Sequence, residues 1–303
     1  MADLSFDPKD LSQVELHHYL LSAVAPRPIC FASTVDATGR VNLSPFSFFN
    51  VFSSNPPVMI FSPSRRGRDN TTKHTLENVL AVPEVVINIV NHPIVEQMSL
   101  SSTEYAEGVN EFVKAGLTQR PSVQVQPPRV GEAPVAFECR VTEVKALGDG
   151  PGAGNLVFAE VVHVHVREEY LDENRQLDTP RLDLVARMGG SWYGRMSPEA
   201  LFEIPKPLQR QGIGVDQLPA SARNSTVLTG NNLGRLGNQE RLPNAAEIED
   251  SQRTASVQSA LAKHTTREAR LKAMHHEVQA LLEAGQDREA LALVFAGDVF
   301  FHK

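Results

Sequence analysis

Short hydroxyl, amide and aromatic side chains gather in the segment that begins at Pro26. The residues concerned are Arg27, Pro28, Ser33, Thr34, Asn42, Ser44, Phe46, Ser47 and Phe49. Hydroxyls and backbone N–H groups can bond the polar edge of a planar cofactor while aromatic groups cover its faces. Composition alone favours the simpler interpretation, ordinary strand and turn residues, because these residue types are common in both.

A second cluster combines cations and hydroxyls at an expected helix start. It comprises Ser62, Ser64, Arg65, Arg66, Arg68, Lys73 and Thr75. A helix N-terminus offers free N–H groups and the positive end of the dipole, so cations and hydroxyls beside it favour phosphate binding. A solvated basic turn is the alternative, but the concentration of cations in an acidic chain favours the anion site.

Other motifs do not carry chemistry. The Gly148–Gly154 run lacks the dinucleotide fingerprint, because Ala153 stands where the third glycine belongs and a strand follows. A hairpin loop is the better interpretation. His163 and His165 share one face of an expected strand, but no further ligand stands at a known spacing. We therefore expect a surface or interface pair and no metal site.

Composition limits the classes of function. The chain has 303 residues, is 41% hydrophobic and carries a formal charge of −7, which is typical of a soluble globular protein and argues against general nucleic-acid binding. The N-terminus shows no secretory signal, and the uncharged stretch of residues 41–64 has too many prolines for a membrane helix. Cys30 and Cys139 are expected to be buried, reduced thiols in a cytoplasmic protein.

Hydrophobic patterns predict the elements that position these residues. We expect helices over residues 69–80 and 94–101, with a Pro-rich excursion over 101–131. The expected strands cover residues 28–35, 41–51, 58–61, 85–90, 136–147 and 155–167.

The amino-acid composition changes after about residue 205. Residues 206–250 have few large apolar side chains and indicate a linker or an arm on the surface, whereas residues 251–303 indicate helices. One helix carries an apolar stripe and stops at Gly285, and Asp287 can cap the next. The stripe consists of Leu271, Met274, Val278, Leu281 and Leu282. We predict two domains, residues 15–205 and 206–303.

An ordered series of motifs resembles the flavin-reductase-like family of FMN-binding split barrels, in particular its flavoredoxin-like branch. The series is Ala25-Pro-Arg-Pro-Ile29, Ser33-Thr34 with Asp36 and Gly39, Asn42-Leu-Ser-Pro-Phe-Ser47, Asn55-Pro-Pro57, and Lys73-x-Thr75 with Asn78. The likeness covers roughly residues 15–200 and leaves the C-terminal hundred residues unexplained. One departure is His74, where the family often has aspartate.

The resemblance implies a mainly β fold, a six-stranded antiparallel split β-barrel with peripheral helices and a helical C-terminal extension. It implies a homodimer with FMN near the dimer interface. Ser33 and Thr34 would touch the isoalloxazine, and Arg27 and Pro28 would shape the pocket. The ring and ribityl chain would be lined by Asn42, Ser44, Phe46, Ser47 and Phe49, and the phosphate held by Ser62, Lys73 and Thr75.

The implied function is an FMN-dependent oxidoreductase, an NAD(P)H:flavin reductase that passes hydride from NADH or NADPH to flavin N5. No catalytic side chain is required, because the flavin carries the chemistry. The electrons would go to free flavin, a monooxygenase partner or another acceptor. A flavoredoxin-like electron-transfer protein with a protein donor and a non-catalytic flavin-binding protein are the alternatives. The sequence leaves open the choice between NADH and NADPH and the role of residues 206–303.

Overall fold

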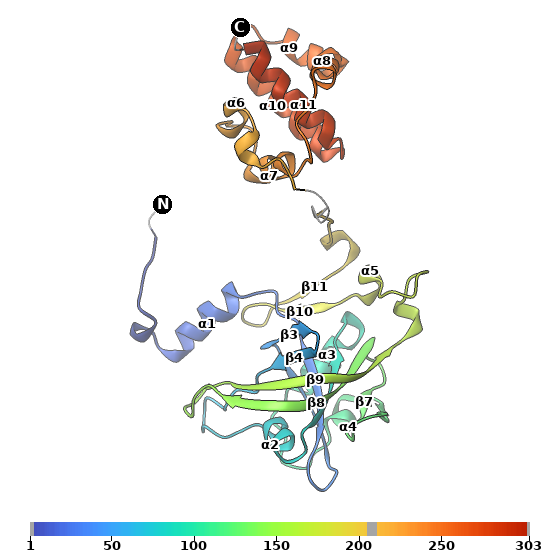
Figure 1. The fold of residues 1–303 in the computed structure, drawn as a ribbon. Helices are drawn as coiled ribbons and strands as arrows, with labels where there is room; N and C mark the ends of the chain where they lie inside the picture. Colours follow the sequence, from blue (N-terminus) through green and yellow to red (C-terminus); the bar gives the residue numbers. More distant parts are fainter. Residues whose placement is uncertain (1–2, 205–210, 302–303) are drawn as a thin grey trace. The chain divides into compact units, whose positions relative to one another are not determined.

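The chain forms two compact units, Met1–Phe202 and Glu203–Lys303, which are described separately. The computed structural model describes residues 3–204 and 211–301 (Figure 1). Within these ranges, no helix is both long and apolar enough to cross a membrane.

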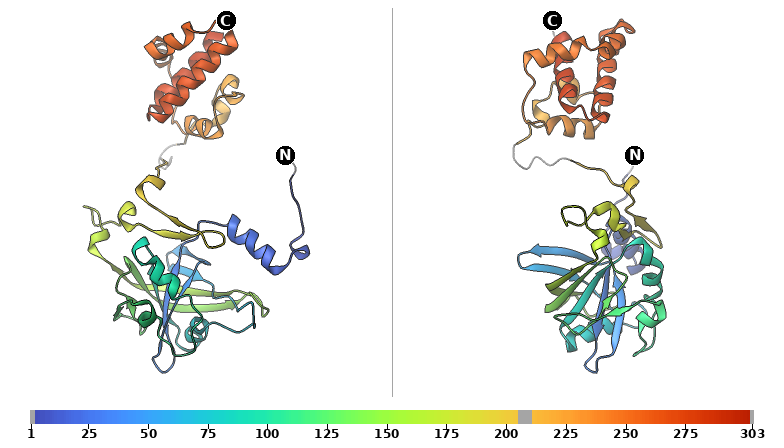
Figure 2. Two further views of the ribbon diagram at one scale, coloured as in Figure 1. Left: turned by 180° about the vertical axis from the view of Figure 1, so that it is seen from behind. Right: turned by 90° about the vertical axis from the view of Figure 1, so that its right-hand side faces the viewer.

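The N-terminal unit is built on one seven-stranded sheet in which every strand pair is antiparallel. Its order is β2-β1-β5-β8-β9-β4-β3. The long β8–β9 hairpin (Figures 1 and 2) lies within the sheet, between β5 and β4. The expected turn at Gly148–Gly154 joins its two strands. The strands are β1 Cys30–Val35, β2 Val41–Phe46, β3 Phe49–Ser54, β4 Pro57–Phe61, β5 Glu84–Ile89, β8 Val135–Ala146 and β9 Asn155–Val166.

The two edge strands show that this sheet curls. β2 and β3 lie at opposite ends of the order, yet just Ser47 and Phe48 connect them. In a flat sheet these edges would lie about 29 Å apart, whereas the chain from Phe46 to Phe49 can span at most about 11 Å. The sheet must therefore bend until its edges approach.

Two fold predictions need correction. The sheet has seven strands rather than six, because the expected strand over residues 41–51 is divided between the two edges at Ser47 and Phe48. Within the described ranges no ladder joins β2 to β3, so barrel closure is not observed. The fold class is mixed α/β rather than mainly β, because helices cover the sheet and build the second unit.

Helices cover the two faces of the sheet. On one face, α2 (His74–Ala81) buries Leu76 and Val79 against a core that includes Phe61. On the other face, α3 (Val95–Leu100) buries Met98, and α4 (Glu111–Ala115) buries Phe112 and Ala115, in a core with residues of β1 and β2. Alternation along each strand supplies both cores, since successive side chains point to opposite faces.

Shorter elements complete this unit. Helix α1 (Gln13–Ala23) begins with a capping box between Ser12 and Glu15, and none of its residues is buried. The excursion of residues 101–131 contains α4 and short strands. The remaining elements are η1 Pro8–Asp10, η2 His92–Ile94, η3 Glu168–Tyr170, η4 Pro198–Ala200, α5 Thr179–Leu182, β6 Gln119–Arg120, β7 Arg129–Val130, β10 Val185–Arg187 and β11 Tyr193–Arg195.

The C-terminal unit is helical with its own apolar core. Helices α10 (Arg267–Glu283) and α11 (Asp287–Phe301) form a hairpin around Gly285, whose φ of +77° suits glycine. The predicted stripe contributes Met274, Val278 and Leu282 to the core. The other elements are η5 Val215–Gln217, α6 Ala220–Arg223, α7 Gly230–Gly237, α8 Ala245–Arg253 and α9 Ala255–Ala262.

The expected linker over residues 206–250 is structured where it is described, from residue 211 onward. It contains α6, α7 and most of α8, and three of its leucines, Leu218, Leu228 and Leu236, are buried in the core. Capping boxes at Thr229 and Asn244 start α7 and α8, so local hydrogen bonds compensate for the sparse apolar pattern. Residues 206–210 lie outside the described ranges.

Candidate functional site

The N-terminus of α2 has no side-chain cap, an arrangement that suits an anion. The helix begins at His74 after the extended residue Lys73, and no side chain caps it. The helix expected over residues 69–80 therefore starts later than predicted, and Asp69 accepts hydrogen bonds from Thr71. The N–H groups of the first turn and the positive end of the helix dipole thus remain for a ligand.

The charge on Lys73 is poorly compensated. Burial lowers the pKa of its ammonium, the Arg66 guanidinium lowers it further, and Glu104 opposes the change. Its Nζ lies 5.8 Å from the centre of the Phe46 ring. Among the described residues, no ion pair involves Lys73. A phosphate at the helix start would restore the favourable charged form of this side chain.

Strand β2 brings polar side chains to the same place. Asn42, Ser44 and Phe46 are two residues apart and share one strand face. Asn42 Nδ2 donates to Thr75 Oγ1 at 2.9 Å. A parallel tie joins β1 to α2, since Asn78 Nδ2 donates to Thr34 Oγ1 at 3.0 Å. These buried hydrogen bonds fix the start of α2 against the sheet.

The side chains surround two adjoining hollows. The smaller, of about 30 Å³, has room for a compact polar group; the larger, of about 300 Å³, extends toward the turn after β1. Asn42 and His74 line both. The smaller hollow brings together four predicted residues, Asn42, Ser44, Lys73 and Thr75.

The smaller hollow also contains Arg66, which the sequence placed in the basic cluster but not among the FMN-binding residues, and Glu111, which was not predicted as a site residue. Arg66 lies beside Lys73, with its Nε 3.4 Å from Glu104 Oε1. Glu111 is 6% exposed, and its Oε2 accepts the Leu43 N–H at 2.9 Å. Burial raises the pKa of the Glu111 carboxyl, while the Leu43 N–H and His74 oppose this. The Glu111-Phe112 motif and the basic run from Arg65 were the available sequence signals.

Other predicted residues lie near this hollow without lining it. The Phe46 ring contacts the Phe61 ring, with centroids 5.5 Å apart, and Phe49 packs against the same core. Ser62 follows Phe61, and its N–H donates to Phe48 O at 2.9 Å. A Cβ on Gly154 would come 2.7 Å from Ser62 Oγ, so this glycine permits the close approach of the β8–β9 turn.

Ser33 and Thr34 point to opposite faces of β1. Thr34 faces α2, whereas Ser33 Oγ is buried on the other face without a hydrogen-bond partner in the described part of the chain. The structure therefore places just one of these two hydroxyls toward the α2 start. Ser47 lies half-buried in the link between β2 and β3.

Arg27 ties three segments of backbone together. Its Nη1 donates to Leu21 O and Val24 O, and its Nη2 donates to Met188 O at 2.9 Å. Burial lowers the pKa of the Arg27 guanidinium, and Arg187 adds to this. Pro28 beside it is exposed. The observed contacts of Arg27 hold α1 and β10 in place, and a contact with the flavin stays a prediction.

Residue chemistry at the hollow fits an FMN phosphate. An uncapped helix start, the desolvated Lys73 and the hydroxyl of Thr75 form a suitable donor set. Among the described residues, no group of three His, Cys, Asp or Glu side chains could hold a metal ion. Cys30 and Cys139 are buried and free.

The curled antiparallel sheet is the fold of a flavin-binding class of proteins, as the comparisons with known proteins show. Residues 22–182 match the family described as flavin reductase like domain. The chain belongs to this flavin reductase-like, FMN-binding split-barrel family.

Relatives extend the match to full-length proteins. An uncharacterized protein of Aquifex aeolicus is 36% identical over 66% of this chain and 100% of its own length. An uncharacterized protein of Halalkalibacterium halodurans is 35% identical over 67% of this chain and 97% of its own length.

Solved structures show the same fold. Nitrilotriacetate monooxygenase component B from Bacillus cereus has a TM-score of 0.63 and 27% identity, covering 67% of this chain and all of that one. The 2-nitrobenzoate 2-nitroreductase of Pseudomonas fluorescens has a TM-score of 0.57 and 26% identity, covering 67% of this chain and 97% of that one. The flavoredoxin of Desulfovibrio vulgaris, at 21% identity over 61% of this chain and 93% of its own and a TM-score of 0.51, supports the fold alone.

Proposed function

We propose that this chain is an FMN-dependent oxidoreductase of the NAD(P)H:flavin reductase type. The observation that carries the proposal is the uncapped start of α2 beside the desolvated Lys73, within the part of the chain that matches the family. When bound, FMN would supply a hydride acceptor at N5 for reduced nicotinamide.

The protein's own residues would bind and orient the cofactor. Lys73, Thr75 and the first N–H groups of α2 would hold the phosphate, and Ser44 lies in the same hollow. The ties Asn42–Thr75 and Asn78–Thr34 keep the helix start at a fixed position against β1 and β2. Ser62, Ser47, Phe46 and Phe49 would approach the rest of the cofactor from the nearby edge of the sheet.

The electron acceptor would be free flavin or a monooxygenase partner. Support for a partner comes from the solved relative named as component B of a monooxygenase, because such a component works with another protein. A flavoredoxin-like electron carrier with a protein donor, and a flavin-binding protein without catalysis, remain rival proposals that the same experiment separates.

A second copy of the chain is the proposed structural partner. Helix α1 buries none of its residues, and Val14, Leu20 and Val24 on it are exposed. Strand β3 exposes Val51 and Phe52. Apolar surface of this kind is favourable to cover, and a homodimer would do so; light scattering on the full-length protein tests it. The free thiols Cys30 and Cys139 support a cytoplasmic location.

The function is tested by loading the full-length protein with FMN, removing the excess, and recording the visible spectrum anaerobically with NADH and then NADPH. We expect retained flavin that bleaches with one of the two. Lys73→Ala should weaken FMN binding by about ten- to a hundredfold, the loss of one charged hydrogen bond. Lys145→Ala, an exposed lysine on β8, is the matched control.

Each other result has a definite meaning. Flavin that bleaches with a reduced protein partner and not with nicotinamides would support the electron-transfer proposal. Flavin that no donor reduces would support the non-catalytic one. Equal FMN affinity in the Lys73→Ala and Lys145→Ala variants would remove the α2 start from the site.

A further inference from the structure

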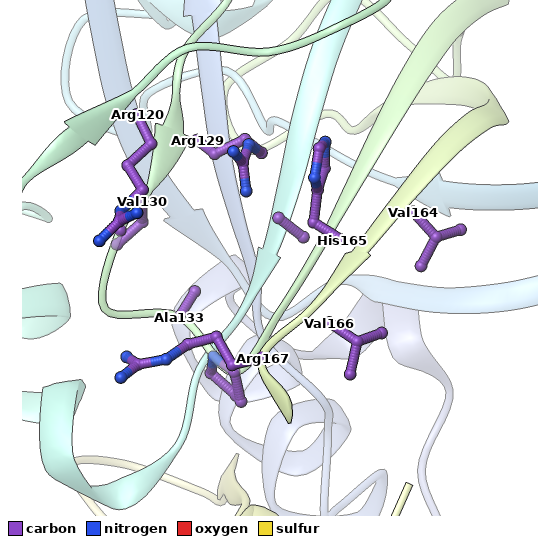
Figure 3. Close-up of a pocket in the computed structure, with 11 residues that line it drawn as sticks. Arg120, Arg129, Val130, Ala133, Val164, His165, Val166 and Arg167 are labelled. Carbon is purple, nitrogen blue, oxygen red and sulfur yellow. The ribbon is translucent and has the colours of Figure 1, made fainter. Parts of the chain in front are cut away.

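A separate hollow of about 390 Å³ lies on the far part of the β8–β9 hairpin, lined mainly by basic side chains and small apolar ones. We call it the arginine hollow, after Arg120, Arg129 and Arg167. Figure 3 shows Arg120 and Arg129 near each other, His165 extending from β9, and Arg167, the residue after β9, extending below Val130. None of these residues belongs to the site at α2.

The arginines differ in how far their charge is compensated. Arg167 forms an ion pair with Glu169, with Nη2 2.9 Å from Oε1, and its Nη1 donates to Glu132 O. Arg129 donates from Nε to Pro121 O, a neutral acceptor. Arg120 has no acidic partner within the described ranges. Within the described ranges, two of the three guanidinium groups therefore form no ion pair and could pair with an anionic ligand.

The nearest carboxylates are already occupied. Glu138 is fully buried and accepts the N–H groups of Val123 and Gln124, and its Oε1 lies 2.5 Å from His165 Nε2. The carboxylate of Glu132 accepts the Thr118 N–H. Burial lowers the pKa of the Arg129 guanidinium, Glu138 opposes this, and Arg120 adds to the lowering. The repulsion from Arg120 is one that a bound anion would relieve.

A glycine lets Arg120 reach into place. A Cβ on Gly131 would lie 3.1 Å from Arg120 Nε and 3.1 Å from Thr118 Cβ, which is tighter than ordinary contact. A residue with a side chain at position 131 would therefore displace the side chain of Arg120. Val130, Ala133 and Ala136 form an apolar floor below the cations, each almost fully buried.

We propose that the arginine hollow binds the phosphate group of a small phosphorylated molecule. Its volume falls within the range of small-molecule sites, about 300–1,000 Å³. Guanidinium groups supplied to one hollow by different segments of the chain match the three terminal oxygens of a phosphate better than the two oxygens of one carboxylate. The acidic chain as a whole, with a net charge of −7, argues against a nucleic acid as the occupant.

The test is calorimetric titration of the full-length protein, with and without FMN, using inorganic phosphate and adenosine 5′-monophosphate as probes. We expect binding in both states. Arg120→Ala should weaken it by about tenfold or more, the loss of one charged hydrogen bond. Arg167→Ala should weaken it less, because Glu169 already shares that charge. Arg140 is an exposed arginine on β8, the strand that carries the hollow residue Ala136, but it lies outside the hollow. Arg140→Ala should therefore leave the affinity for both probes unchanged.

Gly131→Ala gives an independent check, because it keeps every charge and displaces Arg120. Weaker binding in this variant supports the geometry. Tighter binding of the nucleotide identifies an organic phosphate as the ligand, and equal or tighter binding of inorganic phosphate identifies the free ion. The proposal is overturned if the unmodified protein binds neither probe at millimolar concentrations, if Arg120→Ala binds as well as Arg140→Ala, or if FMN competes with the probe.

Discussion

The two compact units bury different kinds of side chain. In the described part of the C-terminal unit, the core is apolar and the buried polar side chains are Ser251 and His275. The N-terminal unit buries many more, and they are Arg27, Ser33, Thr34, Asn42, Ser62, Thr75, Asn78, Asn88, Asn91, Ser101, Glu111, Glu138 and Asn155.

This contrast separates packing from function. A buried polar group costs free energy unless it is hydrogen-bonded, so a unit selected for packing alone avoids such groups. In the N-terminal unit they tie β1 and β2 to α2 at the proposed flavin site, and they hold Glu138 beside the arginine hollow. The C-terminal unit has the composition of a helical module whose stability comes from apolar contact.

Removing apolar contact from the C-terminal core should have the largest effect. Leu282→Ala truncates a side chain that is 1% exposed in that core, and we expect a loss of about 2–5 kcal/mol in its free energy of unfolding. Urea unfolding followed by circular dichroism measures it. Leu242→Ala, at a 45% exposed position of the same unit, should cost about 0.5 kcal/mol or less.

The same variant tests whether the units are energetically separate. We expect the temperature of FMN release from the N-terminal unit to be equal in Leu282→Ala and Leu242→Ala. A lower temperature of FMN release in Leu282→Ala would show that the helical unit stabilises the flavin site. The two units would then not be energetically separate.

The buried histidine makes the C-terminal unit sensitive to acid. Ser225 Oγ lies 2.8 Å from His275 Nδ1, and burial lowers the pKa of His275 from 6.5 to about 4. Between pH 6.5 and about 4, His275 is protonated in the unfolded state but neutral in the folded state. Stability is therefore complete above pH 6.5 and falls by about 3 kcal/mol as the pH drops through 4.

Denaturant unfolding of the C-terminal unit between pH 7 and 4 measures how its free energy of unfolding falls with pH. His276→Gln, at the exposed neighbouring position, should retain most of this pH dependence, whereas His275→Gln should flatten it. An equal pH dependence in both variants would assign the acid sensitivity to other groups.

Arg27 distinguishes a structural contact from a cofactor contact in the N-terminal unit. Arg27→Met removes a buried donor from the carbonyls of Leu21, Val24 and Met188, and should cost about 1.5–3 kcal/mol of stability. Thermal unfolding of the FMN-free protein measures this loss. Arg181→Met is the control, because that exposed arginine also donates to a carbonyl and should matter little. Unchanged stability with a shifted flavin spectrum would instead place Arg27 at the flavin.

Local patterns predicted most of the fold. Runs of apolar and β-forming residues predicted β1, β4, β5, β8 and β9, and the apolar stripe predicted α10, because each signal lies within one element. The division of residues 41–51 into β2 and β3 depends on the curling of the whole sheet, which no local window contains. The helices between residues 220 and 253 were missed since few apolar residues mark them, although the caps at Thr229 and Asn244 are readable.

The site was predictable where one segment builds it. Lys73 and Thr75 come from the start of α2, and Asn42 and Ser44 from alternation along β2. Arg66 and Glu104 join them from loops and Glu111 from the start of α4, so their meeting depends on tertiary structure. Arg27 shows that a motif can also mislead. Its residue type and motif predicted a place in the flavin pocket, whereas its observed partners are backbone carbonyls.

Neighbouring hydroxyls on β1 give the smallest and sharpest test of the contrast. Thr34→Val preserves shape but leaves Asn78 Nδ2 without its acceptor in a buried place, and should cost about 1–3 kcal/mol. Ser33→Ala removes a buried hydroxyl that has no partner in the described structure, so it should cost nothing in the FMN-free protein. Thermal unfolding of both variants without FMN makes the comparison. A loss in Ser33→Ala equal to that in Thr34→Val would mean that Ser33 has a partner of its own, and that buried polarity in this unit serves packing as much as the flavin site.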